Sequence, residues 1–340
     1  MSRHSLYFTG ERSVTIREET LPDLPPDQVL VTSIYSAISA GTEMLVYRQK
    51  VPADMDVDSQ LAVLPGQFKY PLKYGYAVVG KITETGSEIN PDLQGKLVHA
   101  FHPHESHFHA DPDDLLLLPE SLEPEEALFL PNTETALNLV MDGAPIAGET
   151  VVVTGQGIVG LLTTGVLEQF PMLKIYTLDH FQLRRNASLQ FGATQSFDTD
   201  SNSMDTLREL LFPEDEISGA DLLYEVSGNP KALDSLLELA GFGSRIVVGS
   251  WYGTKAVSLD LGGRFHRNRV KIISSQVSTL GTQFADRWTK QRRLNLAMRQ
   301  LKQLPLQSCI THRFAFENAA DAYQLIDQHP EKTIQVILTY

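Results

Sequence analysis

The pattern of apolar and polar positions changes character near residue 125. Before it, short β-rich runs such as "DQVLVTSIYSAIS" and "YAVVGKITETG" are separated by Gly, Pro and Asp turns, which predicts a barrel or sandwich-like unit. After it, short apolar strands such as "TVVVT" and "KIYTLD" alternate with helix-like segments, which predicts a parallel sheet with crossover helices. Near the end, "RWTKQRRLNLAMRQLKQL" is typical of a basic amphipathic helix and "TIQVILTY" of a closing strand.

Composition narrows the classes of protein. The chain has 340 residues, 42% hydrophobic and 21% charged, which is an ordinary globular composition. At about 100–200 residues per domain, this length predicts two domains. The net charge of −14 repels phosphate backbones, so we expect no nucleic acid partner. A cofactor phosphate can still bind locally through backbone N–H groups.

Membrane segments and cysteine chemistry are not expected. No apolar run approaches the ~20 residues that span a bilayer, and "MSRHSLYFTGERSV" lacks the apolar stretch of a signal peptide. The single cysteine, Cys309, excludes an internal disulfide and a multi-cysteine zinc site. We therefore expect a cytoplasmic protein with no membrane partner.

A glycine-rich turn is the strongest motif in the chain. The sequence "GQGIVG" at 155–160 follows the strand "TVVVT" and opens a helix. The first glycine allows a tight turn, the second lets a pyrophosphate approach the backbone, and the third allows close helix packing. The helix N-terminus adds free N–H groups for the phosphates. The cofactor-binding candidates here are Gly155, Gly157, Ile158, Val159 and Gly160. The alternative is a tight turn that binds nothing.

An acidic residue after the next strand bears on the choice of cofactor. Asp179 ends "KIYTLD", where a carboxylate would bind the ribose 2′-OH of a dinucleotide. The same charge repels a 2′-phosphate, so NAD(H) is preferred and NADP(H) remains possible. Arg184 and Arg185 follow closely and weaken the preference, and Arg184 joins the cofactor-binding candidates.

Several stretches together resemble one enzyme family. They are "AGTE" (40–43), "YGYAVVGKI" (74–82), "GKLVHAF" (95–101), "PNTETALNLV" (131–140), the glycine motif, "YEVSGNPKAL" (224–233) and "KTIQVILTY". On them the whole chain resembles the medium-chain dehydrogenase/reductase superfamily, of the zinc-alcohol-dehydrogenase-like group. The resemblance implies an α/β fold, with a GroES-like β-rich catalytic domain of residues 1–125 and 282–340. A Rossmann NAD-binding domain with a doubly wound parallel sheet, residues 126–281, is inserted between them.

The departures from the family concern its metal. Zinc-binding members have Cys-Gly-Thr-Asp where this chain has Ala40-Gly41-Thr42-Glu43, and Gly-His-Glu where it has Gly75-Tyr76-Ala77. The third ligand position falls at about Pro131. A catalytic zinc needs three protein ligands, so we expect no zinc. The first hundred residues resemble the branch that contains bacteriochlorophyllide hydroxyethyl dehydrogenase, but later segments give no support for a tetrapyrrole substrate.

Without zinc, a hydrogen-bond donor and a general acid/base must act on the substrate oxygen. Thr42 matches a family position whose hydroxyl relays the substrate proton, and a turn-capping threonine is the alternative. Glu43 matches a carboxylate that supports the zinc-ligand histidine in relatives. It could orient Tyr76, act as the base, or simply be exposed. Tyr76 replaces the lost histidine, and it could donate to substrate or pack in the core.

The stretch "HAFHPHESHFHAD" holds five of the ten histidines, namely His99, His102, His104, His107 and His109. By the resemblance, His102 falls at a substrate-contacting position and His104 just after it. Histidine suits proton transfer near neutral pH, so both are catalytic candidates. In a strand the two would share a face, as would the last two histidines. An unconventional metal site with Glu105 or Asp111 and a solvated loop remain open alternatives.

Further cofactor contacts follow from the resemblance. The positions are Thr135, Val226, Gly228, Gly249, Ser250, Ser275 and Gln276. Gln335 stands where many relatives place an arginine on the pyrophosphate. An arginine set could hold an anionic substrate, although a solvated helix face with local ion pairs is the preferred interpretation. Its members are Arg264, Arg267, Arg269, Arg287, Arg292 and Arg293.

The sequence thus predicts a zinc-independent NAD(H)-dependent oxidoreductase that transfers hydride between nicotinamide and a small alcohol or carbonyl substrate. An NAD(P)H-dependent C=C reductase of the enoyl or quinone type is the alternative, and a non-catalytic cofactor-binding protein is a third. By analogy with relatives, "IVVGSWYGTKAVSLDL" could extend a sheet across a two-fold axis, so we expect a homodimer.

Overall fold

The computed structural model describes residues 1–52, 54–57, 63–213 and 219–340. The chain forms two compact units, the first of Met1–Pro131 with Ile310–Tyr340 and the second of Asn132–Cys309. The sequence-based division had placed 282–309 with the first unit. These residues lie in the second unit, because the helix that they contain is fastened there. Within the described residues, no helix is both long enough and apolar enough to cross a bilayer.

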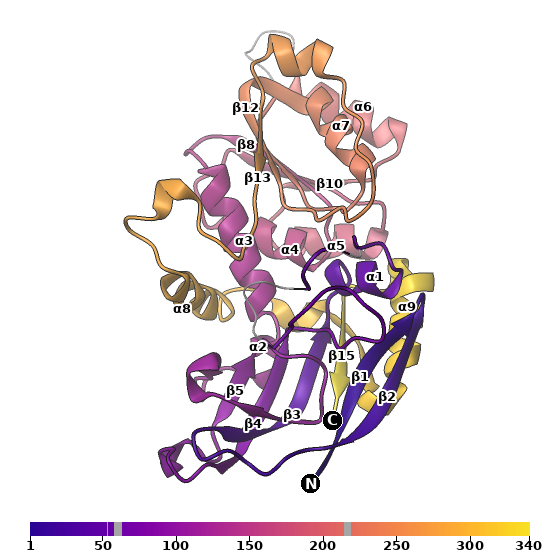
Figure 1. Ribbon diagram of the computed structural model, residues 1–340. Coiled ribbons are helices and arrows are strands. Elements are labelled where there is room, and N and C mark those ends of the chain that lie inside the picture. Colours follow the sequence, from indigo (N-terminus) through magenta and orange to yellow (C-terminus); the bar gives the residue numbers. More distant parts are fainter. Residues whose placement is uncertain (53, 58–62, 214–218) are drawn as a thin grey trace. The chain divides into compact units, whose positions relative to one another are not determined.

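The first unit is built on an antiparallel sheet. Its path runs β14 (Ile310–Ala315), β15 (Gln335–Thr339), β3 (Val29–Ile38), β4 (Val78–Thr85), β5 (Leu97–Ala100) and β7 (Leu115–Leu117), and β6 (His107–Ala110) also pairs with β3. Figure 1 shows β3, β4 and β5 side by side. Among the described strands of this sheet, β14 and β15 are parallel and the other neighbours are antiparallel. Because β15 pairs with β3, the C-terminal residues complete the N-terminal sheet.

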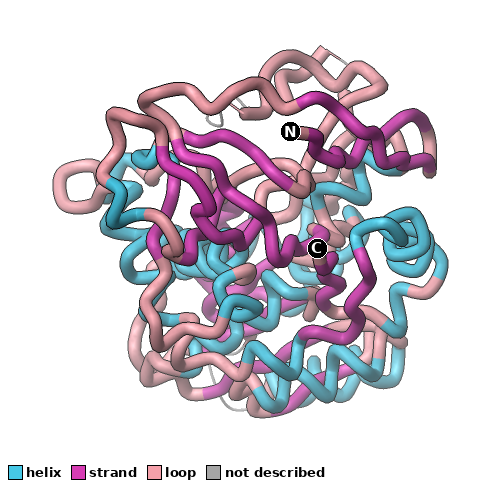
Figure 2. The backbone as a smooth tube through the Cα atoms, turned by 90° about the horizontal axis from the view of Figure 1, so that it is seen from below, coloured by secondary structure: helices cyan, strands magenta, loops and turns pink. Residues whose placement is uncertain are grey.

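Apolar side chains at alternate positions of these strands pack together to form the core of the first unit. Val29 and Val31 of β3 pack with Val78 and Ile82 of β4 and with Phe108 of β6. Burying each such side chain contributes about 1.5–3 kcal/mol. The hairpin of β1 (Ser2–Gly10) and β2 (Ser13–Thr20) forms a separate two-stranded sheet. Both chain termini belong to this unit, and Figure 2 labels the two ends.

Three helices belong mainly to the first unit. They are α1 (Thr42–Tyr47), α2 (Pro124–Ala127) and α9 (Ala319–Gln328). Helix α9 buries Ala319, Ala322, Tyr323 and Ile326, which recur at helical spacing and define one apolar face. Helix α1 buries every residue from Glu43 to Tyr47, so a carboxylate enters the core with it.

The second unit is a parallel sheet with crossover helices. The strand order is β10 (Gln195–Phe197), β9 (Lys174–Leu178), β8 (Thr150–Thr154), β11 (Ala220–Glu225), β12 (Ala240–Val248) and β13 (Lys271–Ser274). The helices are α3 (Leu130–Gly143), α4 (Ile158–Glu168), α5 (Gln182–Gln190), α6 (Ser201–Leu211), α7 (Pro230–Leu239) and α8 (Lys290–Gln300), and α4 to α7 lie against the sheet (Figure 1). The order reverses between β8 and β11, where such sheets bind ligands at the strand ends.

The predicted basic helix is present as α8, but one of its arginines is not on a solvated face. Arg293 is fully buried and donates to Glu134 at 3.0 Å, to Asn138 and to the carbonyl oxygen of Val277. The preferred interpretation of the arginine set, a solvated helix face with local ion pairs, is therefore wrong for Arg293. Arg292, one position earlier, is exposed, as that interpretation expects. Because a helix turns 100° per residue, adjacent positions point in different directions.

Candidate active site

The glycine turn lies between β8 and α4 in the second unit. Gly155 has φ +89, and a Cβ there would lie 2.5 Å from Ser227 Cα, so only glycine fits. A Cβ at Gly160 would lie 1.8 Å from the Gly155 carbonyl oxygen. The lack of a side chain at Gly160 therefore allows the helix to pack close to the turn. At Gly157 the nearest atom would be Arg184 Nη1, at 4.0 Å, so the backbone is open there. Gly157 caps α4 without a side-chain hydrogen bond, which leaves the first-turn N–H groups to a ligand.

Asp179 is fastened to this turn. Its Oδ2 accepts the Gln156 N–H at 2.7 Å and its Oδ1 the Phe181 N–H at 2.8 Å, and its side chain is buried. The two bonds fix the carboxylate beside the turn, and each oxygen keeps a lone pair for a further donor. Arg185 is engaged in an ion pair with Asp198 at 2.7 Å, whereas Arg184 lies over the Phe181 ring.

The other predicted cofactor residues of this sheet follow β11, β12 and β13. Ser250 Oγ accepts the Gly228 N–H at 2.8 Å, which joins the ends of β11 and β12, and Val226 precedes that turn. The Gly249 N–H donates to the Glu225 carbonyl oxygen at 3.0 Å. Parallel strands end at one edge, so these residues lie at the same edge of the sheet as the glycine turn.

Sequence reasoning missed a buried carboxylate at that edge. Glu225, the last residue of β11, accepts hydrogen bonds from the Ser227 N–H at 2.9 Å and from the Tyr252 hydroxyl at 2.6 Å. Burial, followed by the neighbouring Glu225, raises the pKa of Tyr252. The signal available in the sequence was a charged residue directly after the apolar run "LLY" (222–224) of a strand.

The remaining cofactor candidates lie on α3 and after β13. Thr135 is half-buried in α3, and Gln276 is exposed with its amide N–H donating to Ser278 Oγ at 2.8 Å. Ser275 Oγ accepts from the Asn138 amide at 2.9 Å. The Asn138 side-chain oxygen also accepts a hydrogen bond from Arg293, so the buried arginine and the segment after β13 share one hydrogen-bond network.

The first unit contains a fully buried acid–imidazole pair. Glu43 is completely buried, and its Oε1 accepts the Ser39 N–H at 2.8 Å. Its Oε2 accepts from the Tyr323 hydroxyl and lies 3.0 Å from His104 Nε2. The alternative of an exposed glutamate is therefore wrong, because α1 carries Glu43 into the core, where three donors satisfy it.

His104 is equally buried and has a partner on each nitrogen. Its Nδ1 lies 2.7 Å from Ser36 Oγ, which lies 3.0 Å from the Tyr340 hydroxyl. A neutral imidazole with its proton on Nε2 satisfies this whole chain from Tyr340 to Glu43. Burial raises the pKa of Tyr340 and, with Glu43 second, that of Tyr323.

Gly75 makes room for this imidazole. It has φ +127, and a Cβ there would lie 2.8 Å from His104 Cδ2 and Nε2. Tyr76, the next residue, directs its hydroxyl to Ser39 Oγ at 2.6 Å. The position that holds a histidine in zinc-binding relatives is thus a tyrosine linked to Glu43 through Ser39, and His104 occupies the place beside the carboxylate.

Thr42 and Ser39 lie at the boundary of the buried network. The Thr42 N–H donates to Ser39 Oγ at 3.3 Å, and both residues are half-buried, as is Tyr76. Helix α1 is capped by Gly41 without a side-chain hydrogen bond, so the turn-capping alternative for Thr42 does not hold. No sequence pattern marks Ser36, Tyr323 or Tyr340, because their partners are distant in the chain. Ser39 has near partners in Thr42 and Glu43, but its bond from Tyr76 spans 37 positions.

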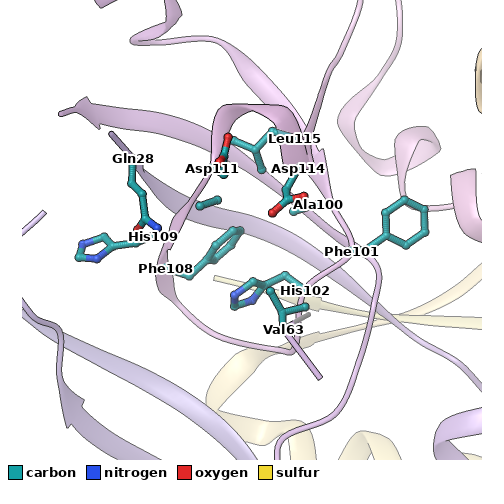
Figure 3. Close-up of a pocket in the computed structure, with 11 residues that line it drawn as sticks. Gln28, Val63, Ala100, Phe101, His102, Phe108, His109, Asp111, Asp114 and Leu115 are labelled. Atoms are coloured by element: carbon teal, nitrogen blue, oxygen red, sulfur yellow. The ribbon is translucent and has the colours of Figure 1, made fainter. Parts of the chain in front are cut away.

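His102 lies in a different environment from His104. Its ring stacks on Phe108 with centroids 3.7 Å apart, and burial lowers its pKa to about 4, so it is neutral at pH 7. It lines a small pocket of about 150 Å³ with Phe101, Phe108, Asp114 and others (Figure 3). The two histidines do not share a strand face, because residues 101–106 form no strand.

Glu105 anchors the loop between these histidines to the β1–β2 hairpin. It pairs with Lys73 at 2.5 Å and with Arg3 at 3.3 Å, and it accepts from Ser5 at 2.9 Å. These partners occupy Glu105, one of the two carboxylates, with Asp111, that the metal alternative offered.

The donor set does not fit a metal at either proposed place. In the described residues, no group of three or more His, Cys, Asp or Glu side chains is arranged to hold a metal ion. Ala40 and Pro131 offer no side-chain ligand at the positions where relatives hold zinc, and the Tyr76 hydroxyl bonds to Ser39.

Gln335, at the position where many relatives place an arginine, has a local role. Its amide donates to the Ile38 carbonyl oxygen at 2.9 Å within the first unit.

Comparisons with known proteins agree with this fold. No protein-family model matches the chain. D-guloside 3-dehydrogenase of Escherichia coli K12 is 24% identical over 98% of this chain and 99% of its own. Galactitol-1-phosphate dehydrogenase of E. coli superposes with a TM-score of 0.79 at 18% identity, covering 99% of this chain and all of its own. An alcohol dehydrogenase of E. coli CFT073, solved with NADH, gives a TM-score of 0.77 at 18% identity over 100% of this chain and 99% of its own.

The parallel strand order, the antiparallel unit and the full-length similarity define the class of protein. Its GroES-like and Rossmann units, and its full-length similarity to curated dehydrogenases, are those of the medium-chain dehydrogenase/reductase superfamily. It is an oxidoreductase of the alcohol-dehydrogenase-like group. The predicted superfamily and fold class are confirmed.

Proposed function

We propose that this protein is a zinc-independent, nicotinamide-dependent dehydrogenase that interconverts a secondary alcohol and its carbonyl compound. The observation that carries the proposal is the buried Glu43–His104 pair, joined through Ser39 to the half-buried Tyr76, which stands where zinc-binding relatives have a ligand histidine. Relatives named for a guloside and for galactitol 1-phosphate favour a polyol or sugar derivative as the substrate class.

The proposed cofactor is NAD(H). The open backbone at Gly157 and the free N–H groups of α4 suit a pyrophosphate, and the Asp179 carboxylate beside them suits a ribose diol. Arg184 next to Gly157 is the feature that keeps NADP(H) possible. Ser250, Ser275 and Thr135 are proposed to complete the cofactor contacts.

In the proposed mechanism the bound nicotinamide exchanges a hydride with the reacting carbon. The protein's own residues donate hydrogen bonds to the substrate oxygen and exchange its proton. Tyr76 and Thr42 provide hydroxyls at the boundary of the buried network. Glu43 and His104 are its buried members and are hydrogen-bonded to each other. His102, neutral at pH 7, is proposed as a substrate contact through the pocket that it lines.

The test combines activity with metal content. The tag-free protein is dialysed against a chelator, its metal per chain is measured by plasma mass spectrometry, and NADH formation is followed with polyols, polyol phosphates, methyl glycosides and 2,3-butanediol. We expect turnover by protein that carries far less than one metal per chain, and a preference for NAD⁺ over NADP⁺. Activity that vanishes with the chelator and returns with zinc would overturn the proposal.

A C=C reductase of the enoyl or quinone type is the second candidate, since loss of the zinc-ligand side chains suits it equally. Such reductases usually prefer NADPH, which Asp179 disfavours, so strong NADPH selectivity with an enone panel would favour it. Binding of NADH without turnover of either panel would indicate a non-catalytic cofactor-binding protein.

We also propose a cytoplasmic homodimer. Strand β13 is the edge of the parallel sheet and exposes Ile272, so pairing with a second copy would continue the sheet. Light scattering after size-exclusion chromatography is expected to give twice the mass of one chain, and a monomer at micromolar concentration would contradict it.

A further inference from the structure

Three hydrogen bonds meet at Ser39, at the end of β3. Its Oγ accepts the Tyr76 O–H at 2.6 Å and the Thr42 N–H at 3.3 Å, and its own N–H donates to Glu43 at 2.8 Å. Within the described part of the chain, these bonds occupy the two lone pairs of Oγ and leave its O–H proton without an acceptor. Ser39 is half-buried, so this proton can reach a bound molecule.

A hydroxyl with this set of partners is a strengthened donor. Each bond that an oxygen accepts draws electron density from it and makes its own proton a better donor, more so away from bulk water. Glu43 orients the backbone of Ser39 by accepting its N–H. Tyr76 donates its hydroxyl proton to Ser39 Oγ and can replace a proton that Ser39 donates. Neither Glu43 nor His104 can perform this donation, because both side chains are completely buried.

We propose that Ser39 is the catalytic hydroxyl that donates to the substrate oxygen in place of a metal, and that Tyr76 acts through it. This inference rests on the proposed alcohol–carbonyl reaction. In reduction, the carbonyl carbon gains the hydride, the C=O π bond breaks, and the oxygen takes the proton of Ser39 Oγ. Ser39 then takes the Tyr76 hydroxyl proton, and Tyr76 regains a proton from water. Oxidation runs the same transfers in reverse.

The test uses four variants of the full chain: Ser39→Ala, Ser39→Thr, Tyr76→Phe and the double variant Ser39→Ala/Tyr76→Phe. We measure kcat and KM in carbonyl reduction at saturating NADH, together with the Kd for NADH and the unfolding midpoint. Loss of a general acid lowers rates by about 10²–10⁴, so Ser39→Ala is expected to lose about 100-fold or more in kcat. Ser39→Thr keeps a hydroxyl and is expected to recover most of that loss.

The double variant separates a relay from two independent contributions. If Tyr76 acts only through Ser39, Tyr76→Phe lowers kcat in the parent but has little further effect in Ser39→Ala. The control is Thr32→Val in the same strand, whose hydroxyl lies 3.0 Å from that of Thr83 and belongs to no candidate site. The control and all four variants are expected to keep the parent's Kd for NADH.

Two outcomes overturn the inference, and they are distinguishable. If the parent turns over no carbonyl compound in the panel, the proposed function fails and the inference fails with it. If the parent is active and Ser39→Ala keeps kcat within about threefold while Thr42→Val loses activity, the proposed function stands and the donor is Thr42.

Discussion

At the scale of single residues, the histidines of one short stretch have very different environments. His104 has a partner on each nitrogen, whereas His99 is fully buried and neither of its nitrogens bonds to a described residue. Burial lowers the pKa of His99 from 6.5 to about 3. An unpaired polar group in the core costs stability even when neutral, so His99 stabilises little by itself.

The buried imidazole predicts a pH dependence of stability. The folded pKa of His99 lies below the unfolded value, so the folded state binds fewer protons between about pH 3 and pH 6.5. Stability is fully present above pH 6.5 and falls as the pH drops through that window, by about 1.4 kcal/mol per pH unit for one proton.

The variant His99→Leu is expected to lose that dependence. Its unfolding free energy relative to the parent should rise by roughly 1–2 kcal/mol between pH 7 and pH 5, measured by urea denaturation. His266→Leu, which removes an exposed imidazole, is the matched control. An equal difference between His99→Leu and parent at both pH values would contradict the prediction.

Gly75 supports the Glu43–His104 pair by its lack of a side chain. The variant Gly75→Ala is expected to lose about 2–4 kcal/mol in unfolding free energy, from a strained φ of +127 and from the contact with His104. Gly66→Ala is the control, because Gly66 has φ +84 but no atom of the described residues within 4 Å of its Cβ position. A loss at Gly75 no larger than at Gly66 would mean that the imidazole moves aside at little cost.

At the scale of elements, one buried side chain links α8 to other parts of the second unit. Arg293 joins α8 to α3 through Glu134 and Asn138, and to the segment after β13 through Val277. The periodicity of α8 is evident in the sequence, but the partner of a buried charge is not, because it depends on a helix more than a hundred residues earlier.

Removing that charge is expected to be costly. The variant Arg293→Met leaves Glu134 buried without its cation, and breaking such a pair typically costs about 3–5 kcal/mol. Arg293→Met/Glu134→Leu should recover part of the loss, and the exposed Arg292→Met should change stability by less than about 0.5 kcal/mol, all by denaturant unfolding. Since the network includes Ser275, we also expect weaker NADH binding by Arg293→Met; unchanged affinity and stability would contradict both expectations.

At the scale of the whole molecule, the two units differ in chain continuity. The second unit, Asn132–Cys309, is one continuous segment, whereas the first needs both ends of the chain, because β15 lies between β14 and β3. The core of the parallel sheet is drawn from residues of the second unit alone.

Continuity predicts that the second unit folds alone. A fragment that starts before α3, residues 128–309, is expected to unfold cooperatively and to bind NADH with an affinity within about tenfold of the full chain. Binding can be followed by tryptophan fluorescence, because Trp251 and Trp288 both lie in this unit. A fragment that folds without binding NADH, beside a full chain that binds it, would show that the first unit is needed for affinity.

Local physics explains what the sequence by itself determined. Strand alternation, the glycine turn and the helix period arise among residues a few positions apart, so the two kinds of unit and the "GQGIVG" turn were predictable. The lack of zinc-ligand side chains could also be predicted from the sequence, because it depends only on which residues occupy the matched positions.

Only the tertiary structure decided which side chains meet. The contact of Glu43 with His104 joins residues 61 positions apart, and that with Tyr323 residues 280 positions apart. Arg293 and Glu134 are separated by 159 positions. No short-range pattern encodes such pairs, because they form when strands and helices from distant parts of the chain bury their faces together. The burial of Glu43 and the different surroundings of His102 and His104 therefore became visible only in the folded chain.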